Sequence, residues 1–188
     1  LFYRIYHSLY QQYVIRKLLD INFCDPYDPK DKYVYFPLHL VPEYTMLIQS
    51  NMWMNQLFII ESIAKSLPVD WKLYVKEHPA SVGIRLRPIS FYKDIMSYPN
   101  TKLIPYLTNQ HTVISNSELV MTITGTTGLE ALFLHDKPLI TFARSRFDVM
   151  GLSKKVENIE DLAKDIKHEC DRIKNISQEE KKRRKITF

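Results

Sequence analysis

The chain has 188 residues, of which 45% are apolar and 12% aromatic, a composition typical of a globular protein and not of a disordered one. Its formal net charge is +5, but the run Lys181–Lys185 (KKRRK) alone supplies five positive charges, so the remainder is close to neutral, unlike a nucleic-acid-binding domain. The sequence has no run of about 18 uncharged apolar residues that would span a membrane, and its two distant cysteines, Cys24 and Cys170, indicate reduced thiols and not a disulfide framework.

The first forty residues predict a helix, a loop and a strand. In residues 1–20, apolar and aromatic side chains recur every three or four residues, which is typical of a helix. This stripe consists of Phe2, Ile5, Tyr6, Leu9, Tyr13 and Leu19. It either covers the sheet of the same domain or belongs to a larger N-terminal part. Residues 24–32, rich in Asp and Pro, predict a linker, and residues 33–36 (YVYF) predict a strand that ends at Pro37.

The rest of the chain predicts strands and helices in alternation. Strands are expected at residues 71–76, 101–104, 118–124 and 137–142, and helices at 51–66, 91–97, 110–116, 129–134 and 159–173. Such alternation is typical of βαβ units, so the predicted fold class is α/β, with a Rossmann-like parallel sheet and helices on both faces. We expect residues 1–31 to be a helix and linker, 32–176 the Rossmann-like domain, and 177–188 a basic tail.

The stretch 118–131 (ELVMTITGTTGLEA) contains two of the four glycines in the chain. A strand, a Gly/Thr turn and a helix present backbone N–H groups and the positive end of a helix dipole, which together bind anions, most often phosphate. The candidate phosphate-binding residues are Thr124, Gly125, Thr126, Thr127 and Gly128. An ordinary turn in which the glycines only let the chain bend is the alternative, because the motif is neither a Walker loop nor a full G-x-G-x-x-G.

Further polar residues follow other predicted strands. His39 and Glu43 lie in PLHLVPEYT after the first strand, Lys76 and His78 lie in KEHP at the end of the second, and Arg144 follows the strand at 137–142. In open parallel sheets, ligands bind at the carboxyl ends of the strands. We therefore expect these side chains to gather with the Gly/Thr turn at one edge, although a single histidine in a loop is commonly just solvated.

Four sequence blocks, in this order and spacing, resemble the bacterial capsular polysaccharide biosynthesis proteins. They are YVYFPLHLVPE, LYVKEHP, LIP and SELVMTITGTTGLEALFLHDKPLITF, within residues 33–147. Characterised members of that family include Kdo transferases that use CMP-Kdo and have the two-domain GT-B architecture. The resemblance implies that this chain is the C-terminal, donor-binding half of a GT-B glycosyltransferase. The segment before the first predicted strand is too short to be the half that binds the acceptor and usually supplies the acid/base group. We therefore expect either a fragment that carries the donor half or an incomplete enzyme, and no turnover by this chain alone.

The resemblance also implies roles for individual residues. His78 would be the catalytic residue that contacts the CMP phosphate and helps the nucleotide leave. Thr126, Thr127 and the amide of Gly128 would hold the same phosphate, and Glu130 would accept hydrogen bonds from the ribose hydroxyls. A departing CMP gains negative charge on its phosphate, so hydrogen-bond donors placed there stabilise the transition state more than the ground state.

We expect no metal and no other cofactor. The sequence has no D-x-D pair, and Asp25, Asp28 and Asp31 lack the alternate spacing of metal ligands. The expected partners are a nucleotide-sugar donor and a glycan or glycolipid acceptor held by a further domain, with no nucleic acid.

The expected location is the cytoplasm. The sequence starts without Met and lacks the features of a signal peptide, so we expect a piece of a longer protein. The basic run Lys181–Lys185 is either a solvated tail or a peripheral contact with the anionic inner face of the cytoplasmic membrane.

Two other functions fit the same motifs. The first is another nucleotide-sugar enzyme of GT-B topology, such as a CDP-glycerol glycerophosphotransferase or a UDP-sugar 2-epimerase, which the nucleotide base would distinguish. The second is a non-catalytic module, in which the sheet edge is only structural and the aromatic helix or the basic tail binds a partner.

Overall fold

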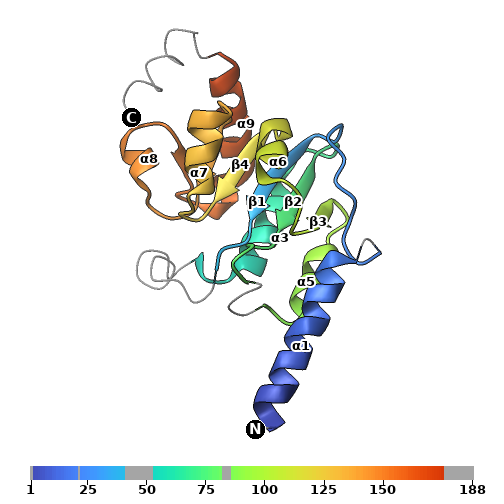
Figure 1. Cartoon of the computed structure of the whole chain (residues 1–188). Helices are drawn as coiled ribbons and strands as arrows, with labels where there is room; N and C mark the ends of the chain where they lie inside the picture. The colour runs from blue at the N-terminus through green and yellow to red at the C-terminus, as the bar shows by residue number, and fades with distance from the viewer. Residues whose placement is uncertain (1, 21, 41–52, 82–85, 176–188) are drawn as a thin grey trace.

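A parallel sheet runs through the middle of the molecule (Figure 1). The computed structural model describes the chain except for residues 1, 21, 41–52, 82–85 and 176–188. Within the described residues the strands are β1 (Tyr33–Pro37), β2 (Lys72–Lys76), β3 (Thr101–Ile104), β4 (Leu119–Thr122), β5 (Leu139–Thr141) and β6 (Lys154–Lys155). Their order in the sheet is β3-β2-β1-β4-β5-β6, and each neighbouring pair is parallel. This is the strand order of the doubly wound Rossmann fold, so the predicted fold class is confirmed.

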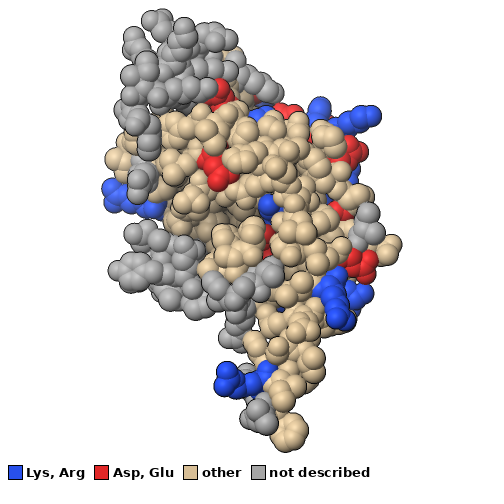
Figure 2. Space-filling view, in the orientation of Figure 1, with Lys and Arg blue, Asp and Glu red and all other residues tan. Residues whose placement is uncertain are grey.

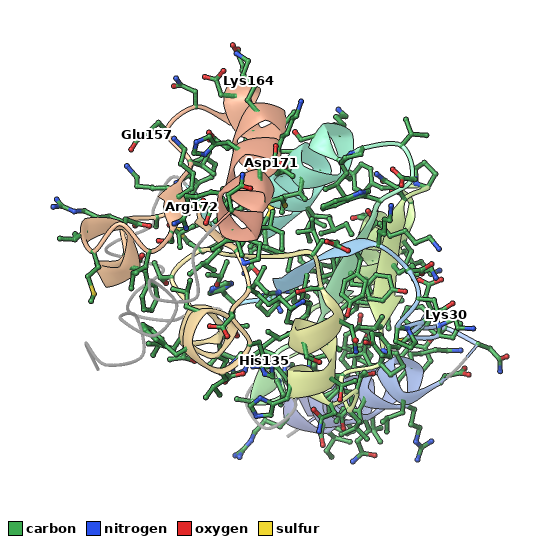
Figure 3. The ribbon with its side chains drawn as sticks, turned by 90° about the horizontal axis from the view of Figure 1, so that it is seen from above. Lys30, His135, Glu157, Lys164, Asp171 and Arg172 are labelled. Carbon is green, nitrogen blue, oxygen red and sulfur yellow. The ribbon has the colours of Figure 1, made fainter. Side chains whose placement is uncertain are left out.

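Helices cover both faces of the sheet. They are α1 (Phe2–Leu19), α3 (Gln56–Ser66), α5 (Ile89–Met96), α6 (Gln110–Asn116), α7 (Thr127–Leu129), the π-helix η2 (Glu130–Leu134), α8 (Arg146–Val149), the 3-10 helix η3 (Ile159–Asp161) and α9 (Leu162–Lys174). In Figure 3, α9, which carries Lys164 and Asp171, lies on one side of the sheet, and His135, which follows η2, lies on the other.

The alternation of side chains along the strands separates two cores. Val34 and Phe36 of β1 belong to the larger cluster, which includes buried residues of α3, α5 and α9. Tyr33 and Tyr35 belong to the smaller cluster, with buried residues of α6, η2 and α8. Since successive residues of a strand point to opposite faces, one strand contributes to both cores. A strand buried on both faces needs apolar residues at every position, which explains the continuous apolar and aromatic run of β1.

Most predicted elements agree with the structure, with bounds that differ by a few residues. β3 and α6 have the predicted bounds, β4 is shorter than the predicted strand 118–124, and β6 was not predicted because it is only two residues long. The helix predicted at residues 129–134 relied on apolar residues spaced to pack against the sheet, but Leu134 is 62% exposed. Residues 130–134 form a π-helix, whose wider turn breaks the three- and four-residue spacing on which that prediction relied.

The aromatic stripe of α1 does not cover the sheet. Phe2, Ile5, Tyr6, Leu9, Tyr13 and Leu19 are all at least 46% exposed. The helix instead packs into the larger core through Val14 and Leu18, and its first turns extend away from the sheet (Figure 1). At about 100° per residue, the stripe lies on the side of the helix opposite Val14 and Leu18. No helix in the described part of the chain is long and apolar enough to cross a membrane.

A half-buried carboxylate, that of Asp31, joins three strands at the amino-terminal edge of the sheet. Asp31 precedes β1, and its Oδ1 accepts a hydrogen bond from Lys72 Nζ at 2.6 Å. Its Oδ2 accepts from Lys102 Nζ at 2.8 Å and from the Tyr74 hydroxyl at 2.5 Å. Burial alone would raise the pKa of Asp31, but these three donors outweigh it and hold the pKa well below its usual range. One side chain therefore fastens the chain before β1 to both β2 and β3.

Replacing Asp31 by Asn should destabilise the fold by about 2 kcal/mol, because the hydrogen bonds to a charged acceptor are lost. This corresponds to a fall in melting temperature of roughly 4 to 8 °C in a chain of this size. The folded-state pKa is depressed, so the contribution of Asp31 is present above pH ~4 and is lost as the pH falls below that value. Thermal unfolding followed by circular dichroism at several pH values checks this.

Asp70→Asn is the control for this prediction. Asp70 pairs with Lys32, but its side chain is 67% exposed, and exposed ion pairs contribute little to stability. An Asp31→Asn variant as stable as Asp70→Asn would contradict the structural role of the Asp31 cluster.

Candidate functional site

The strand order reverses between β1 and β4, which are neighbours in the sheet. In doubly wound sheets, the loops that leave such a pair of strands diverge and open a crevice at their carboxyl ends. His39 follows β1, and residues Thr124–Gly128 follow β4. His78 follows β2, the strand on the other side of β1. The two histidines and the Gly/Thr turn therefore lie at one edge of the sheet, with the loop of His39 in the middle.

His39 is a buried residue and not a solvated one, with only 5% of its surface exposed. Its Nε2 lies 3.0 Å from Thr122 Oγ1 and 3.5 Å from the backbone N of Thr124. Thr122 Oγ1 accepts a hydrogen bond from the amide of Gly125 at 3.1 Å, which leaves the hydroxyl hydrogen free to be donated to Nε2. These partners assign the ring proton to Nδ1. The ring thus connects the end of β1 to the start of the Gly/Thr turn.

The buried environment of His39 keeps the imidazole neutral. Burial lowers its pKa most, the nearby charges of His78 and Arg87 lower it further, and the carbonyl of Pro37 opposes them. The resulting pKa is about 4. At neutral pH the ring therefore acts through hydrogen bonds and not through charge.

The backbone of His39 is held by two side chains that the sequence analysis missed. Gln56, at the start of α3, accepts a hydrogen bond from the His39 amide at 2.9 Å and donates one to its carbonyl at 3.1 Å. Arg87 Nη2 donates to the same carbonyl. Gln56 is only 3% exposed although it is polar, so this contact satisfies an otherwise costly buried amide. Neither residue comes directly after a strand, so the rule used to choose candidates could not find them.

The Gly/Thr turn uses part of its own backbone. The amide of Gly128, which was predicted to hold phosphate, already donates to the carbonyl of Gly125 at 3.1 Å. The reason is local, because the chain closes into a tight turn before α7 begins. Within the described residues, the amides of Thr126 and Thr127 have no hydrogen-bond acceptor, and Thr126 is exposed. The donors available to an anion at this turn are therefore these two amides and the threonine hydroxyls.

Close contacts explain the two glycines of the turn. A Cβ at position 125 would lie 3.0 Å from both His39 Nε2 and Thr122 Oγ1. A Cβ at position 128 would lie 3.0 Å from Leu139 Cδ2 and 3.2 Å from Phe147 Cε2. Gly125 thus allows the His39 ring to approach the turn, and Gly128 allows α7 to pack on β5 and α8.

Lys76 and Glu130 are engaged on the side of the sheet that α6 covers. Lys76 is 3% exposed, and its Nζ donates to the carbonyl of Thr108 at 3.0 Å. Burial lowers the pKa of Lys76, and the charge of Glu130 partly offsets this. Glu130 Oε2 accepts a hydrogen bond from Gln110 Nε2 at 2.8 Å, and Oε1 accepts none from the residues that the structure describes.

The remaining candidates are less constrained. His78 is exposed, and its Nδ1 accepts a hydrogen bond from the amide of Ala80 at 3.1 Å, which leaves Nε2 as the ring atom that can contact a ligand. Arg144 is exposed in the loop after β5. Glu43 lies outside the described residues. Among the residues that the structure describes, no three His, Cys, Asp or Glu side chains gather in a group that could hold a metal ion.

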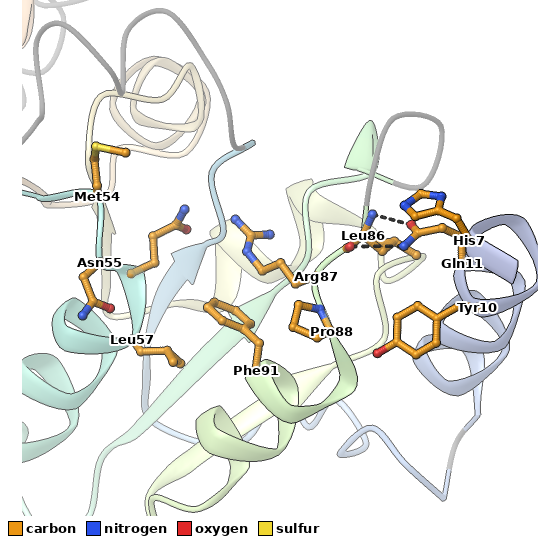
Figure 4. A pocket seen from close by; sticks show the side chains of 11 residues that line it. His7, Tyr10, Gln11, Met54, Asn55, Leu57, Leu86, Arg87, Pro88 and Phe91 are labelled. Carbon is orange, nitrogen blue, oxygen red and sulfur yellow. Dashed lines mark hydrogen bonds between the residues drawn. The ribbon is translucent and has the colours of Figure 1, made fainter. Parts of the chain in front are cut away.

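A cavity of about 640 Å³ lies beside this edge, between α1, α3 and α5 (Figure 4). Its lining comprises His7, Tyr10, Gln11, Met54, Asn55, Gln56, Leu57, Leu86, Arg87, Pro88 and Phe91. Most of its polar side chains serve the fold. Gln11 exchanges hydrogen bonds with the backbone of Leu86, Tyr10 accepts one from the amide of Ile89, and Asn55 caps α3. Of the predicted site residues that the structure describes, none lines this cavity.

The distribution of charge agrees with the near-neutral composition. On the face seen in Figure 2, the described Lys and Arg side chains lie apart from one another, mostly at the margins, and most of the surface is uncharged. Nothing on this face resembles the continuous basic patch of a nucleic-acid-binding protein.

Comparison with known proteins places this fold and these motifs in one family. The profile of the family described as capsule polysaccharide biosynthesis protein matches residues 5–176. The chain belongs to this family. The resemblance inferred from the four sequence blocks is thereby confirmed. A direct sequence comparison with curated proteins finds no match.

Solved structures show the same half of the GT-B fold. The beta Kdo 2,7 transferase KpsC of Thermosulfurimonas dismutans matches with a TM-score of 0.55 and 18% identity, over 78% of this capsule-family chain and 44% of that chain. The beta Kdo 2,4 transferase KpsC of the same organism matches with a TM-score of 0.52 and 16% identity, over 82% and 49%. The UDP-GlcNAc 2-epimerase of Methanocaldococcus jannaschii matches with a TM-score of 0.54 and 18% identity, over 89% and 42%. The chain thus spans less than half the length of each of these proteins.

The capsule-family chain should lose stability in mild acid because of His39. The unfolded chain binds the histidine proton near pH 6.5, but the folded chain binds it only near pH 4, so stability falls as the pH decreases between these values. The full effect is about 3 kcal/mol. His39→Gln should remove this part of the pH dependence, which urea unfolding between pH 4 and pH 7 measures.

His168→Gln is the matched control, because His168 is an exposed histidine on α9. It should unfold with the pH dependence of the unaltered chain. If His39→Gln also keeps that dependence, the buried neutral ring is not its source.

Proposed function

We propose that this chain is the donor-nucleotide-binding half of a glycosyltransferase in capsule polysaccharide synthesis, and that its donor is CMP-Kdo or a similar CMP-sugar. One observation carries the proposal. In a chain of the capsule family, His39, His78 and the free amides of Thr126 and Thr127 follow β1, β2 and β4 at the edge of the sheet where the strand order reverses. The fold shared with proteins named Kdo transferases supports the same donor class.

The proposed mechanism places donors around the nucleotide phosphate. When the glycosidic bond to CMP breaks, the electron pair stays on the phosphate oxygen, whose negative charge increases. His78 Nε2 and the amides of Thr126 and Thr127 donate to that phosphate and stabilise the charge as it develops. Glu130 accepts hydrogen bonds from the ribose hydroxyls through the oxygen that Gln110 does not occupy. Thr124 and Gly125 shape the turn. Lys76, the last residue of β2, adds positive charge from the side of the sheet that α6 covers.

The acceptor would be bound elsewhere. The chain spans less than half the length of the Kdo transferases that it matches. We infer that a glycan or glycolipid acceptor, and the acid/base group that activates it, belong to a further domain, and that this half alone does not turn over. The exposed aromatic stripe of α1 offers such a domain an apolar surface.

The proposed location is the cytoplasm, at the inner face of the membrane. Lys181–Lys185 lies outside the described residues, and its contribution rests on its charge alone: a basic run attracts anionic lipid headgroups. Removing it should lower binding to anionic vesicles and leave nucleotide binding unchanged.

A second candidate function is that of a UDP-sugar 2-epimerase or a related nucleotide-sugar enzyme. The observation that favours it is the epimerase match, whose TM-score equals those of the transferases within a few hundredths. Shared topology provides a phosphate edge in both classes and does not select the base. A purely structural edge, in a non-catalytic module, predicts no nucleotide binding.

Calorimetric titration of the chain with CMP, CDP and UDP tests the proposal. CMP should bind more tightly than UDP, and His78→Ala should weaken CMP binding about 10- to 100-fold, because a hydrogen bond to a charged phosphate is lost. His168→Ala, at an exposed position on α9, should bind CMP as the unaltered chain does. Preference for UDP would favour the epimerase class, and absence of binding by all three nucleotides would leave only the non-catalytic function.

A further inference from the structure

We infer that Glu77 and Arg87 form a positioning unit that fixes the loops of His39 and His78 relative to each other at the sheet edge. The unit deepens the proposed function, because its consequence for nucleotide binding depends on that function. The hydrogen bonds that define the unit within the chain do not depend on the proposed function. Neither residue is among the candidates that the sequence supplied.

Glu77 is the centre of the unit. It lies between Lys76 and His78, yet it is only 1% exposed. Its Oε1 accepts hydrogen bonds from the backbone amide of His78 at 2.7 Å and from Ser81 Oγ at 3.0 Å. Its Oε2 accepts a hydrogen bond from the Tyr92 hydroxyl at 2.6 Å. One buried carboxylate thus fixes the backbone at His78 and ties it to α5, which carries Tyr92.

Arg87 extends the unit to the neighbouring loop. Its Nη1 donates to both oxygens of Glu77, at 2.8 and 2.7 Å, and its Nη2 donates to the carbonyl of His39. The guanidinium is 5.0 Å from the centre of the Phe91 ring, which packs against it (Figure 4). The rigid fork of an arginine contacts a carboxylate and a carbonyl at the same time, whereas the single ammonium of a lysine does not impose this geometry.

The energetics of the buried ion pair allow this unit only one arrangement. A buried ion pair contributes little stability compared with apolar residues of the same shape, but removing one partner leaves the other charge uncompensated. The arrangement of the two loops is therefore enforced, because other positions of Arg87 would separate it from Glu77. What the pair provides at this edge is a fixed distance between the loops after β1 and β2.

The chain contains a matched ion pair away from the sheet edge. Glu169 of α9 is 1% exposed, and Arg172 donates to its two oxygens at 2.7 and 2.5 Å. Arg172 also donates to a backbone carbonyl, that of Leu152, at 3.1 Å. The two pairs share the same chemistry, so a comparison between them separates the effect of general stability from the effect of position.

Arg87→Lys and Arg172→Lys test the unit, each compared with the unaltered chain in thermal unfolding and in calorimetric titration with CMP. Both variants should unfold at lower temperature. Only Arg87→Lys should weaken CMP binding, by about tenfold or more, because the loop of His78 is no longer held against that of His39. Equal CMP affinity in Arg87→Lys and the unaltered chain, or an equal loss in Arg172→Lys, would overturn the inference. If Arg87→Lys does not fold, Tyr92→Phe removes a single donor to Glu77 and should weaken CMP binding about threefold.

A measurement without ligand separates the failure of this inference from that of the proposed function. Arg87→Met removes a positive charge that lowers the pKa of His39, so this pKa, followed by NMR titration of the ring, should rise above about 4. Arg172→Met should leave it unchanged. A raised His39 pKa in a chain that binds none of CMP, CDP and UDP would support the contact and reject the proposed donor. An unchanged pKa in Arg87→Met would reject the unit itself.

Discussion

The contact between the His39 ring and Thr122 is the interaction on which the candidate site depends. β1 and β4 are adjacent strands at the point where the strand order reverses, and in doubly wound sheets the connections of such a pair leave in opposite directions, so backbone hydrogen bonds do not join them. The imidazole connects the end of one strand to the turn that follows the other. Because the ring is buried and neutral, it does this without adding a charge that an anionic ligand or a change of pH near neutrality would disturb.

The two histidines of the edge have complementary environments. His39 has lost access to water and most of its basicity, and both its ring and its backbone are held by neighbours. His78 is exposed and keeps one ring nitrogen for a ligand. A site that binds a developing charge needs donors whose positions are already fixed, since reorganisation during the reaction reduces their effect. In the proposed mechanism, His39 supplies the rigidity and His78 supplies the contact.

Local patterns in the sequence were enough for every strand of the sheet except the two-residue β6, and they failed where distant segments meet. The apolar runs of β1 and β4 and the capped helix α6 carry their own signals, and the rule that ligands bind at carboxyl strand ends placed His39, His78 and the Gly/Thr turn together. The same rule could not show that the Gly128 amide is used within the turn, because that depends on how tightly the turn closes. Nor could it find Gln56 and Arg87, which reach His39 from 17 and 48 residues away.

The segment Lys76-Glu77-His78 shows how a strand end serves several purposes at once. Successive side chains of an extended segment point in opposite directions. Lys76 reaches the loop before α6 on one side of the sheet, Glu77 reaches Arg87 and α5 on the other, and His78 emerges at the edge. A shift of one residue in this register would exchange the buried carboxylate with the exposed histidine side chain and leave Arg87 unpaired. The buried pair therefore fixes not only the distance between two loops but also which side chain after β2 emerges at the sheet edge.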